Sequence, residues 1–419
     1  MYTFASEDRK ILRALARRVA EIAADPCMEK RRRLWTRHNS LKTAYPPMFV
    51  YPYDCWVELI PASTLTCETP DARRIELDLR SRIYQYEHFQ DDMMVEAEWI
   101  ETRAFKDSGW GVDVQRHESK EWRGAWGFEP VIRNSADMKK LHYPELIYDE
   151  AASLRNAASM QDLLGDILEV KLSGVKFCHY HLMAQLTSWI GYNELMTGML
   201  DQPEFIHEIM RFLEEGHHRY LKQLIDANLL SLNNDNAYNT SGGNGYTDEL
   251  PAPGFDPQRV RPVDMWCSAE SQEFAQISPR MHNEFAMQYE KRLLEPFGLT
   301  GYGCCEDLSK KLDYVFTIPH IRRISCSPWA NVDICAVKLK RNYIFSWKPN
   351  PAHMVGGFDA QAIHEYIRHT LEVARANDCA LEIILKDTQT VDFELNRFDR
   401  WTQICRELIN EYYGEYNER

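Results

Sequence analysis

The sequence predicts an α/β fold, namely a (β/α)8 TIM barrel with an N-terminal cap subdomain of helices and irregular structure. From about residue 228 onward, short β-rich runs alternate with amphipathic helical runs at intervals of a few tens of residues. Connections of this length suit parallel strands, which need a crossover between them. No glycine-rich phosphate-binding motif follows any of these strands, so the sequence favours a closed barrel over an open nucleotide-binding sheet.

The elements of the predicted barrel follow one another along the C-terminal part of the chain. Strand-like runs occupy residues 229–235, 264–271, 299–305, 322–329, 342–351 and 379–387. Helical spacing of the apolar residues predicts helices at 203–228, 278–298, 306–318, 331–340, 359–378 and 398–413. We therefore assign the barrel to residues 166–419.

The N-terminal third has a different pattern. Residues 7–24 and 29–41 are spaced as two helices, and a region rich in tryptophan and tyrosine follows them without regular periodicity. Aromatic residues at this density typically hold a small subdomain against a larger one. We expect residues 1–165 to form a cap on the barrel.

Composition and charge restrict the classes of function. The 419-residue chain has 44% hydrophobic and 27% charged residues, near the average for folded water-soluble proteins. Its net charge of −14, from 63 acidic against 49 basic residues, would repel a phosphate backbone and argues against nucleic-acid binding. We recognise no signal peptide or membrane-spanning stretch, so we expect a cytoplasmic protein whose eleven cysteines are reduced thiols. The sequence leaves open whether the protein is a monomer or a homodimer.

Candidate functional residues follow from the predicted barrel, because the chemistry of such barrels takes place at the carboxyl ends of the strands. Acidic residues there that could act as general acids or bases are Glu270, Glu306 and Asp387. Residues that could contact a substrate are His179, His181, Asn234, Asp235, Trp266, Gln272, Trp329 and Lys348. His179 and His181 would share one side of an extended run, where substrate contact or a place in the core is a better expectation than metal binding.

The stretch 302–307 places two cysteines and two acids at the end of a predicted strand. Side chains alternate along a strand, so we expect Cys304 to share one side with Glu306, and Cys305 to share the other with Asp307. Three interpretations remain open. The thiol and carboxylate could be metal ligands, the acid could cap the next helix beside a buried cysteine, or the adjacent cysteines could form a disulfide.

A zinc site is the functional interpretation of this stretch. Thiolates and carboxylates are competent zinc ligands, and a catalytic zinc has about three protein ligands. Cys304 and Glu306 would be two of them, with Cys305 as the alternative thiol. The third ligand could come from Asp387, Glu270 or His353.

A long polar segment, residues 233–254, separates two of the predicted elements without any regular pattern. A loop of this length inside a compact domain is usually a lid or a binding loop. A disordered surface segment is the competing interpretation.

The stretch from about residue 175 to 411 resembles the uroporphyrinogen decarboxylase superfamily, which includes methyltransferases that serve corrinoid proteins. "IGYNELMTGMLDQPEFIHEIMRFLEE" resembles the family's helix pair with its Gly, Leu-Met and Asp-x-Pro-Glu. "SPRMHNEFAMQYEKRLLEPFG" resembles its helix with Ser-Pro, Phe and Tyr-Lys-Arg, and "FSWKPNP" resembles a strand that ends in an Asn-Pro turn. The resemblance implies a (β/α)8 barrel that either decarboxylates a tetrapyrrole or moves a methyl group to or from a corrinoid.

Two features separate these branches. The methyltransferase branch carries His-x-Cys zinc ligands on the strand that corresponds to 302–307, with another Cys near the last strand. Here Cys304 takes the His place, Glu306 the Cys place and Asp387 the last place, which departs from the family and would give a harder, weaker zinc site. The arginine-rich segment of the decarboxylase branch has no counterpart that we can align, because Arg31–Arg33 fall inside a predicted helix.

The resemblance therefore implies a methyltransferase that moves a methyl group between a small methylated donor, such as a methoxyaromatic that is O-demethylated, and the corrinoid of a partner protein. The leaving oxygen or nitrogen needs a Lewis acid or a proton. Cys304, Glu306 and Asp387 would hold zinc, or Glu306 and Glu270 would supply the proton. The alternatives are decarboxylation of a tetrapyrrole-like polycarboxylate and a non-enzymatic partner of a corrinoid protein.

Overall fold

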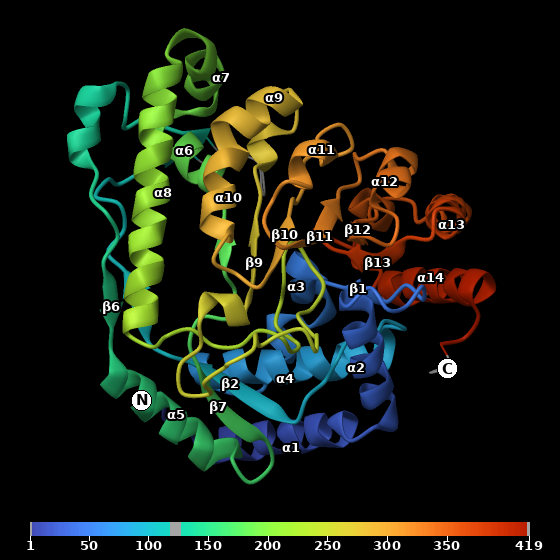
Figure 1. The fold of residues 1–419 in the computed structure, drawn as a ribbon. Coiled ribbons are helices and arrows are strands. Elements are labelled where there is room, and N and C mark those ends of the chain that lie inside the picture. The colour runs from blue at the N-terminus through green and yellow to red at the C-terminus, as the bar shows by residue number, and fades with distance from the viewer. Residues whose placement is uncertain (1, 118–126, 417–419) are drawn as a thin grey trace.

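The computed structural model describes residues 2–117 and 127–416 and shows an α/β protein built on a central parallel sheet (Figure 1). Its seven strands have the order β1-β13-β12-β11-β10-β9-β8, and all neighbours are parallel. They are β1 (Met48–Val50), β8 (His179–Tyr180), β9 (Trp266–Ala269), β10 (Leu299–Tyr302), β11 (Ile321–Cys326), β12 (Ile344–Trp347) and β13 (Ala380–Leu385). Consecutive strands from β9 to β13 are neighbours, as a βα repeat requires.

This sheet is like that of a TIM barrel, but its ladders do not close a ring. Within residues 2–117 and 127–416, no ladder joins the outer strands β1 and β8. The strand predicted at 229–235 contributes one parallel bridge, between Val175 and Leu230. The predicted α/β class is confirmed, and the closed eight-stranded barrel stays a prediction.

Helices connect the strands and cover the sheet. In the C-terminal part these are α6 (Leu182–Ile190), α7 (Tyr192–Asp201), α8 (Pro203–Asp226), α9 (Pro279–His282), α10 (Gln288–Leu294), α11 (Leu312–Val315), α12 (Val332–Leu339), α13 (Ala360–Ala376) and α14 (Arg397–Tyr413). A π-helical turn, Asn283–Met287, joins α9 to α10. Helix α13 begins where predicted because the Asp359 carboxylate accepts the N–H groups of Gln361 and Ala362. The helix predicted at 306–318 is only one turn long, α11.

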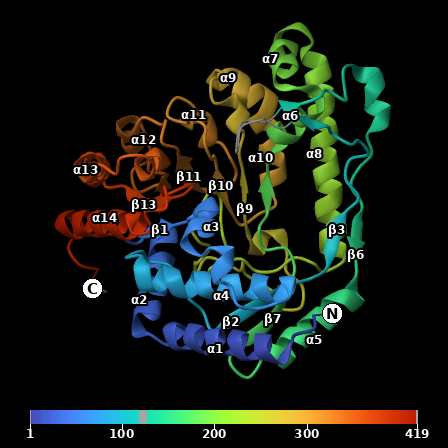
Figure 2. The same cartoon turned by 180° about the vertical axis from the view of Figure 1, so that it is seen from behind.

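The N-terminal part forms a second layer, below the sheet in Figure 1 and in the reverse view of Figure 2. It contains α1 (Ser6–Ala23), α2 (Pro26–Asn39), α3 (Trp56–Leu59), α4 (Pro70–His88), α5 (Glu150–Leu164) and the parallel pair β2 (Glu98–Thr102) and β7 (Glu169–Ser173). Two antiparallel pairs also come from the N-terminal part, β3 (Phe105–Asp107) with β6 (Leu146–Tyr148) and β4 (Arg116–His117) with β5 (Gly127–Phe128). They lie outside this layer (Figure 1): β6 packs beside α8 and β5 contacts α6. A hydrophobic cluster that includes Leu12, Ile75, Leu79 and Leu163 holds α1, α4 and α5 together.

The predicted domain boundary at residue 165 needs a correction. Strand β1 lies in the N-terminal third, yet it pairs with β13 and completes one edge of the central sheet. Sequence patterning missed it because the strand is only three residues long. The first 165 residues therefore contribute to the sheet as well as to the layer below it.

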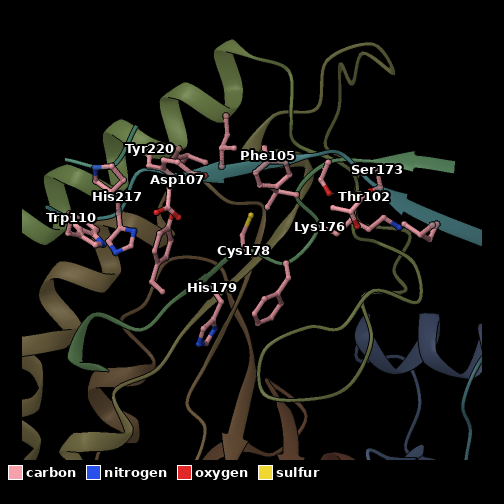
Figure 3. A pocket seen from close by; sticks show the side chains of 18 residues that line it. Thr102, Phe105, Asp107, Trp110, Ser173, Lys176, Cys178, His179, His217 and Tyr220 are labelled. Carbon is pink, nitrogen blue, oxygen red and sulfur yellow. Dashed lines mark hydrogen bonds between the residues drawn. The ribbon is translucent and has the colours of Figure 1, made fainter. Parts of the chain in front are cut away.

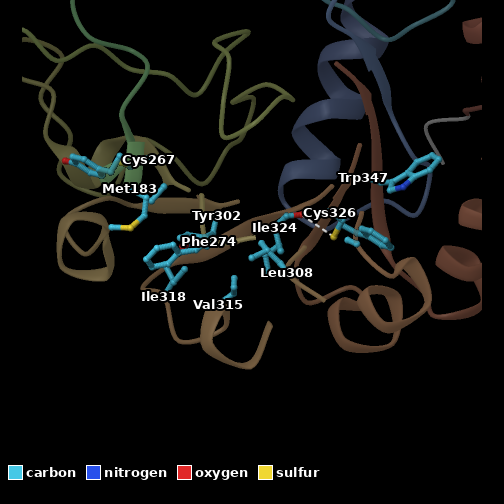
Figure 4. Packing of buried hydrophobic residues seen from close by; sticks show 14 of the residues in the cluster. Met183, Cys267, Phe274, Tyr302, Leu308, Val315, Ile318, Ile324, Cys326 and Trp347 are labelled. Atoms are coloured by element: carbon cyan, nitrogen blue, oxygen red, sulfur yellow. Dashed lines mark hydrogen bonds between the residues drawn. The ribbon is translucent and has the colours of Figure 1, made fainter. Parts of the chain in front are cut away.

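The main hydrophobic core lies between the strands and the helices that cover them. Figure 4 shows Tyr302 of β10 and Ile324 of β11 near Val315 and Ile318 of the α11 region, with Trp347 of β12 farther along the sheet. All five are at most 3% exposed. Among the described helices, none is both long enough and apolar enough to cross a lipid bilayer.

The long segment predicted as a lid is instead packed against the sheet. Asn239, Thr240, Ser241, Asn244 and Thr247 are all at most 5% exposed. Small residues allow this close approach: a Cβ at Gly301 of β10 would lie 2.0 Å from Thr240 Oγ1, and one at Gly242 would lie 2.5 Å from the Ile384 side chain. Neither the lid nor the disordered-surface interpretation describes residues 239–247, which we call the buried loop.

A buried ion pair links β11 to β13, and its guanidinium also contacts this loop. Arg323 of β11 and Glu382 of β13 are both fully buried, with 3.0 Å between Arg323 Nε and Glu382 Oε1. The guanidinium also donates to the side-chain oxygens of Asn239 and Asn39, at 3.0 and 2.6 Å. His38 Nε2 lies 3.1 Å from the other oxygen of Glu382. Asn239 of the buried loop and Asn39 of α2 thus accept guanidinium N–H groups that would otherwise be buried without a partner.

Candidate functional site

Glu270, which directly follows β9, lies between two histidines. His179 Nε2 of β8 is 3.6 Å from Glu270 Oε2, and His181 Nδ1, just after β8, is 3.2 Å from Glu270 Oε1. His181 continues the network through its Nε2, which lies 3.0 Å from Glu273 Oε2. His179 is fixed from its other nitrogen by Ser268 Oγ at 2.8 Å. Adjacent parallel strands bring these groups together because their carboxyl ends meet at one edge.

The network is charged. Burial raises the pKa of Glu270, but its hydrogen bond to His179 and the charges of His179 and His181 outweigh burial and hold that pKa below its usual value. Burial lowers the pKa of His181, but the hydrogen bond to Glu273 and the charges of Glu273 and Glu270 outweigh it and raise that pKa above the usual value. The arrangement therefore favours a carboxylate beside a protonated imidazole.

Two thiols and an amine lie next to this network. The sulfur atoms of Cys304 and Cys305 are 3.5 Å apart, and Lys386 Nζ, after β13, donates to Cys304 Sγ at 3.7 Å and to Asp387 Oδ2 at 2.7 Å. The thiol of Cys304 is also within hydrogen-bonding reach of Glu270. Burial lowers the pKa of Lys386, but Cys304 and Asp387 outweigh burial and raise it, so the amine stays charged.

The strand alternation predicted for this stretch is wrong. Strand β10 ends at Tyr302, and Gly303 adopts φ +96°, a left-handed conformation that turns the chain. Beyond this turn the period-two rule no longer applies. Cys304 and Cys305 therefore lie side by side instead of on opposite faces.

Glu306 does not accompany the Cys304 thiol. Its fully buried carboxylate accepts the backbone N–H groups of Ser271, at 3.1 Å, and of Cys304, at 2.9 Å. Burial raises the pKa of Glu306 despite these hydrogen bonds. Glu306 therefore acts as an acceptor of backbone N–H groups, which fits its contacts better than the role of a substrate or metal ligand. The carboxylate links the segments that follow β9 and β10 and does not cap a helix.

The predicted zinc ligands are not gathered around one point. Asp387 pairs with Lys386, and His353 packs edge-on against Tyr366. The described residues contain no group of three His, Cys, Asp or Glu side chains arranged to hold a metal ion. The residues present do not fit the zinc site that the resemblance implies, and we derive no step through zinc.

Apart from His179 and His181, the predicted substrate contacts separate into two sets. Trp266 is fully buried and its indole N–H donates to the Gly245 carbonyl at 3.0 Å, while Lys348 is 3% exposed and donates to Ser346. Asn234 donates to the Leu250 carbonyl and Asp235 pairs with Lys176, so these residues hold loops together. Gln272 and Trp329 instead line a cavity of about 380 Å³, together with Glu273, Cys305 and Asp307.

A second cavity, of about 580 Å³, lies beside His179. It is bounded by the segment 173–180, strands β2 and β3 and helix α8, and most of its lining is apolar or aromatic. Figure 3 shows Asp107, Trp110, His217 and Tyr220 at one end and Thr102, Ser173 and Lys176 at the other. Among the described residues, β8 forms a ladder with β9 alone, and no residue of β9 lines the cavity, so the cavity lies beside this edge of the sheet.

Sequence reasoning missed the aromatic groups near the thiols. Tyr53, just after β1, lies with its ring 5.8 Å from Lys386 Nζ and hydrogen-bonds Tyr238. Tyr238 packs edge-on against Phe177, whose ring stacks on His179. A strand assignment at 48–50 would have placed Tyr53 among the strand ends.

Comparisons with known proteins identify no family. No family model matches the chain, and no curated protein matches it. Solved structures that are similar include a methyltransferase from Methanosarcina mazei, which covers 91% of this chain and 98% of its own, with 9% sequence identity and a TM-score of 0.48. A similarity at this level carries no inference about activity.

Proposed function

We propose that this protein transfers a methyl group between a small methylated donor and the corrinoid of a separate protein. The proposal starts from the resemblance of the sequence motifs and from one observation at the strand ends. Glu270 is held between His179 and His181, whose nitrogens lie 3.6 and 3.2 Å from its carboxylate. This cluster can deliver a proton to a leaving oxygen or nitrogen.

Proton delivery is what methyl transfer from an ether or amine requires of the chain. An alkoxide or amide anion leaves too slowly unless it is protonated as the bond to the methyl carbon breaks. In our proposal His181, with its raised pKa, holds the proton. Glu270 orients the ring through Nδ1, and Nε2 must exchange Glu273 for the leaving atom of the donor before the proton is transferred. Glu306 takes no part, since backbone N–H groups occupy both its oxygens. The corrinoid, held by the partner, supplies the reduced cobalt that accepts the methyl group.

The cavity of about 580 Å³ supports a donor with an aromatic body. Its volume lies in the range of small-molecule sites, and Phe105, Trp110, Tyr180 and Tyr220 contribute to its lining. His179 belongs both to this lining and to the Glu270 cluster. A methoxyaromatic compound in the cavity would therefore lie next to the Glu270 cluster, with His179 as the residue that the cavity and the cluster share.

Exposed apolar residues on the loops that follow the strands support a protein partner. Trp329 after β11 is 71% exposed, Val355 after β12 is 41% exposed, and Phe393 after β13 is 79% exposed. The loops that carry Val355 and Phe393 are joined by a hydrogen bond from the Gly356 N–H to Asp392. Apolar side chains on the loops around a site suit the docking of a corrinoid protein.

Methyl transfer to free cob(I)alamin tests the proposal. The purified protein would be assayed with methoxyaromatics, methanol and methylamines, and methylcobalamin would be followed by absorbance. Glu270→Gln and His181→Asn should each lower the rate about 10²- to 10⁴-fold, the usual contribution of a general acid or its partner. His369→Asn is the control, because His369 pairs with Asp333 on an exposed surface. Wild-type rates in Glu270→Gln and His181→Asn would refute the proton-delivery mechanism.

The same preparation distinguishes the alternatives. Release of carbon dioxide from a polycarboxylate tetrapyrrole, without methyl transfer, would favour the decarboxylase. That activity would need cations free to bind carboxylates, whereas Lys386 and Lys348 are engaged by Asp387 and Ser346. Binding of a corrinoid protein without turnover of any donor would favour the non-enzymatic partner.

A further inference from the structure

Cys304 and Cys305 form a close pair of thiols at the surface of the strand-end region. Their sulfur atoms are 3.5 Å apart, and both residues are partly exposed. The turn at Gly303 lets two consecutive side chains point the same way, which a regular strand would forbid. Neither the methyl-transfer proposal nor the metal interpretation uses this proximity.

The surroundings of the pair favour thiol chemistry. The Cys304 thiol lies close enough to donate a hydrogen bond to Cys305, and this interaction lowers the pKa of Cys305. The Lys386 ammonium, 3.7 Å from Cys304 Sγ, adds a positive charge that helps to lower the pKa of Cys305. Cys305 also lines the cavity of about 380 Å³ beside the exposed Trp329, so a small oxidant has access to it.

We propose that Cys304 and Cys305 are a site of reversible disulfide formation driven by small-molecule disulfides such as oxidised glutathione. The Cys305 thiolate attacks one sulfur of the oxidant, which forms a mixed disulfide and releases the first glutathione thiolate. Cys304 then loses its proton to solvent, attacks Cys305 Sγ and releases the second glutathione thiolate. The two protein thiols lose two electrons in total, and the oxidant is reduced to two thiols.

Closure of this disulfide would change the neighbouring site. The Sγ atoms must approach from 3.5 Å to about 2.05 Å, so Cys304 moves relative to its neighbours. Glu270 would lose the Cys304 thiol as a hydrogen-bond partner, and Lys386 would keep only Asp387 as an acidic partner there. The proposal concerns the thiols themselves, so it holds or fails independently of methyl transfer.

Mass spectrometry of the whole folded protein tests this inference. The protein is incubated with oxidised glutathione, free thiols are blocked with N-ethylmaleimide, and the peptide that contains residues 304 and 305 is analysed. We expect this peptide to lose two hydrogens, to resist N-ethylmaleimide, and to regain both reactive thiols after dithiothreitol. Cys304→Ser should instead retain a glutathione adduct on Cys305, because the resolving thiol is missing.

Cys326 and Cys335 supply an internal control. Both are fully buried and close to one another, so they should stay unmodified in the folded protein. Stable glutathione adducts on wild-type Cys304 or Cys305, without loss of two hydrogens, would overturn the proposal. The proposal would also be overturned if Cys304 and Cys305 of the wild-type protein stayed unmodified under conditions in which Cys305 of the Cys304→Ser variant is fully glutathionylated.

Discussion

Replacing Arg323 by methionine tests how much the buried Arg323–Glu382 ion pair, together with its hydrogen bond to the buried loop, stabilises the fold. Arg323 and Glu382 are both fully buried, and the guanidinium donates to Glu382, Asn239 and Asn39 at 3.0, 3.0 and 2.6 Å. Its carbon also lies 5.1 Å from the centre of the Trp266 ring. Arg323→Met keeps most of the apolar volume but removes every one of these donors.

The expected loss of stability follows from what remains after the substitution. Glu382 would be a buried carboxylate with His38 and Ser346 as its closest partners, and two asparagine oxygens would lose a donor. Breaking a buried ion pair from one side typically costs about 3–5 kcal/mol. Arg323→Lys should cost less, since the charge stays and only the planar fork is lost.

Urea denaturation followed by circular dichroism measures the change in the free energy of unfolding. Arg368→Met is the matched control, because the Arg368–Glu365 pair lies on the surface with side chains 41% and 46% exposed. Its loss should be below about 1 kcal/mol. If Arg323→Met is no more destabilising than Arg368→Met, the buried ion pair does not stabilise the fold in the way its contacts indicate.

Three further predictions follow from local contacts. Gly301→Ala should destabilise the protein by about 1–3 kcal/mol, because the new Cβ would lie 2.0 Å from Thr240 Oγ1. Adding Thr240→Gly to the Gly301→Ala variant should restore stability in thermal unfolding. If stability is not restored, the contact with Thr240 is not the cause of the loss. Burial raises the pKa of Glu290 from 4.5 to about 8. Between these pH values the folded state binds a proton at Glu290 that the unfolded state has released. The free energy of unfolding should therefore fall as pH rises from about 5 to 8, by up to about 1.4 kcal/mol per pH unit. Glu290→Gln should flatten this slope in urea titrations at several pH values, and an unchanged slope would contradict the assignment. Trp110→Ala should raise the KM of an aromatic donor about 10-fold or more with little change in kcat, because the substitution removes part of the wall of the larger cavity. A change in kcat alone would mean that the donor binds outside this cavity.

Much of the fold could be predicted because its strands and helices carry local signals. The runs at 264–271, 299–305, 322–329, 342–351 and 379–387 coincide with β9 to β13, apart from Ile321 at the start of β11. Helices α8, α12, α13 and α14 match the predicted ranges to within about two residues. Strand β1 and the parallel pair β2 and β7 carry weaker signals, because short strands next to helices lack a clear period. Their places in the fold depend on pairing with strands far along the chain.

The candidate site was predictable in part. The rule that chemistry lies at strand ends selected Glu270, Cys304 and Asp387, and the structure places the first two in contact. The same rule could not give the direction of the Glu306 carboxylate, which turns to the backbone of Ser271 on a neighbouring strand end. It also assigned Trp266 to substrate contact, although this side chain packs on the buried loop.

The sequence by itself determined the α/β class, the order of the elements and the set of polar residues at the strand ends. It could do so because hydrophobic periodicity and capping residues act over a few neighbouring positions. Only the tertiary structure decided that residues 239–247 pack against the sheet, that Cys304 and Cys305 lie together, and that His179 and His181 enclose Glu270. Those outcomes depend on strand pairing and on the left-handed conformation of Gly303. Both are decided by the packing of segments that lie far apart in the sequence, which local periodicity does not report.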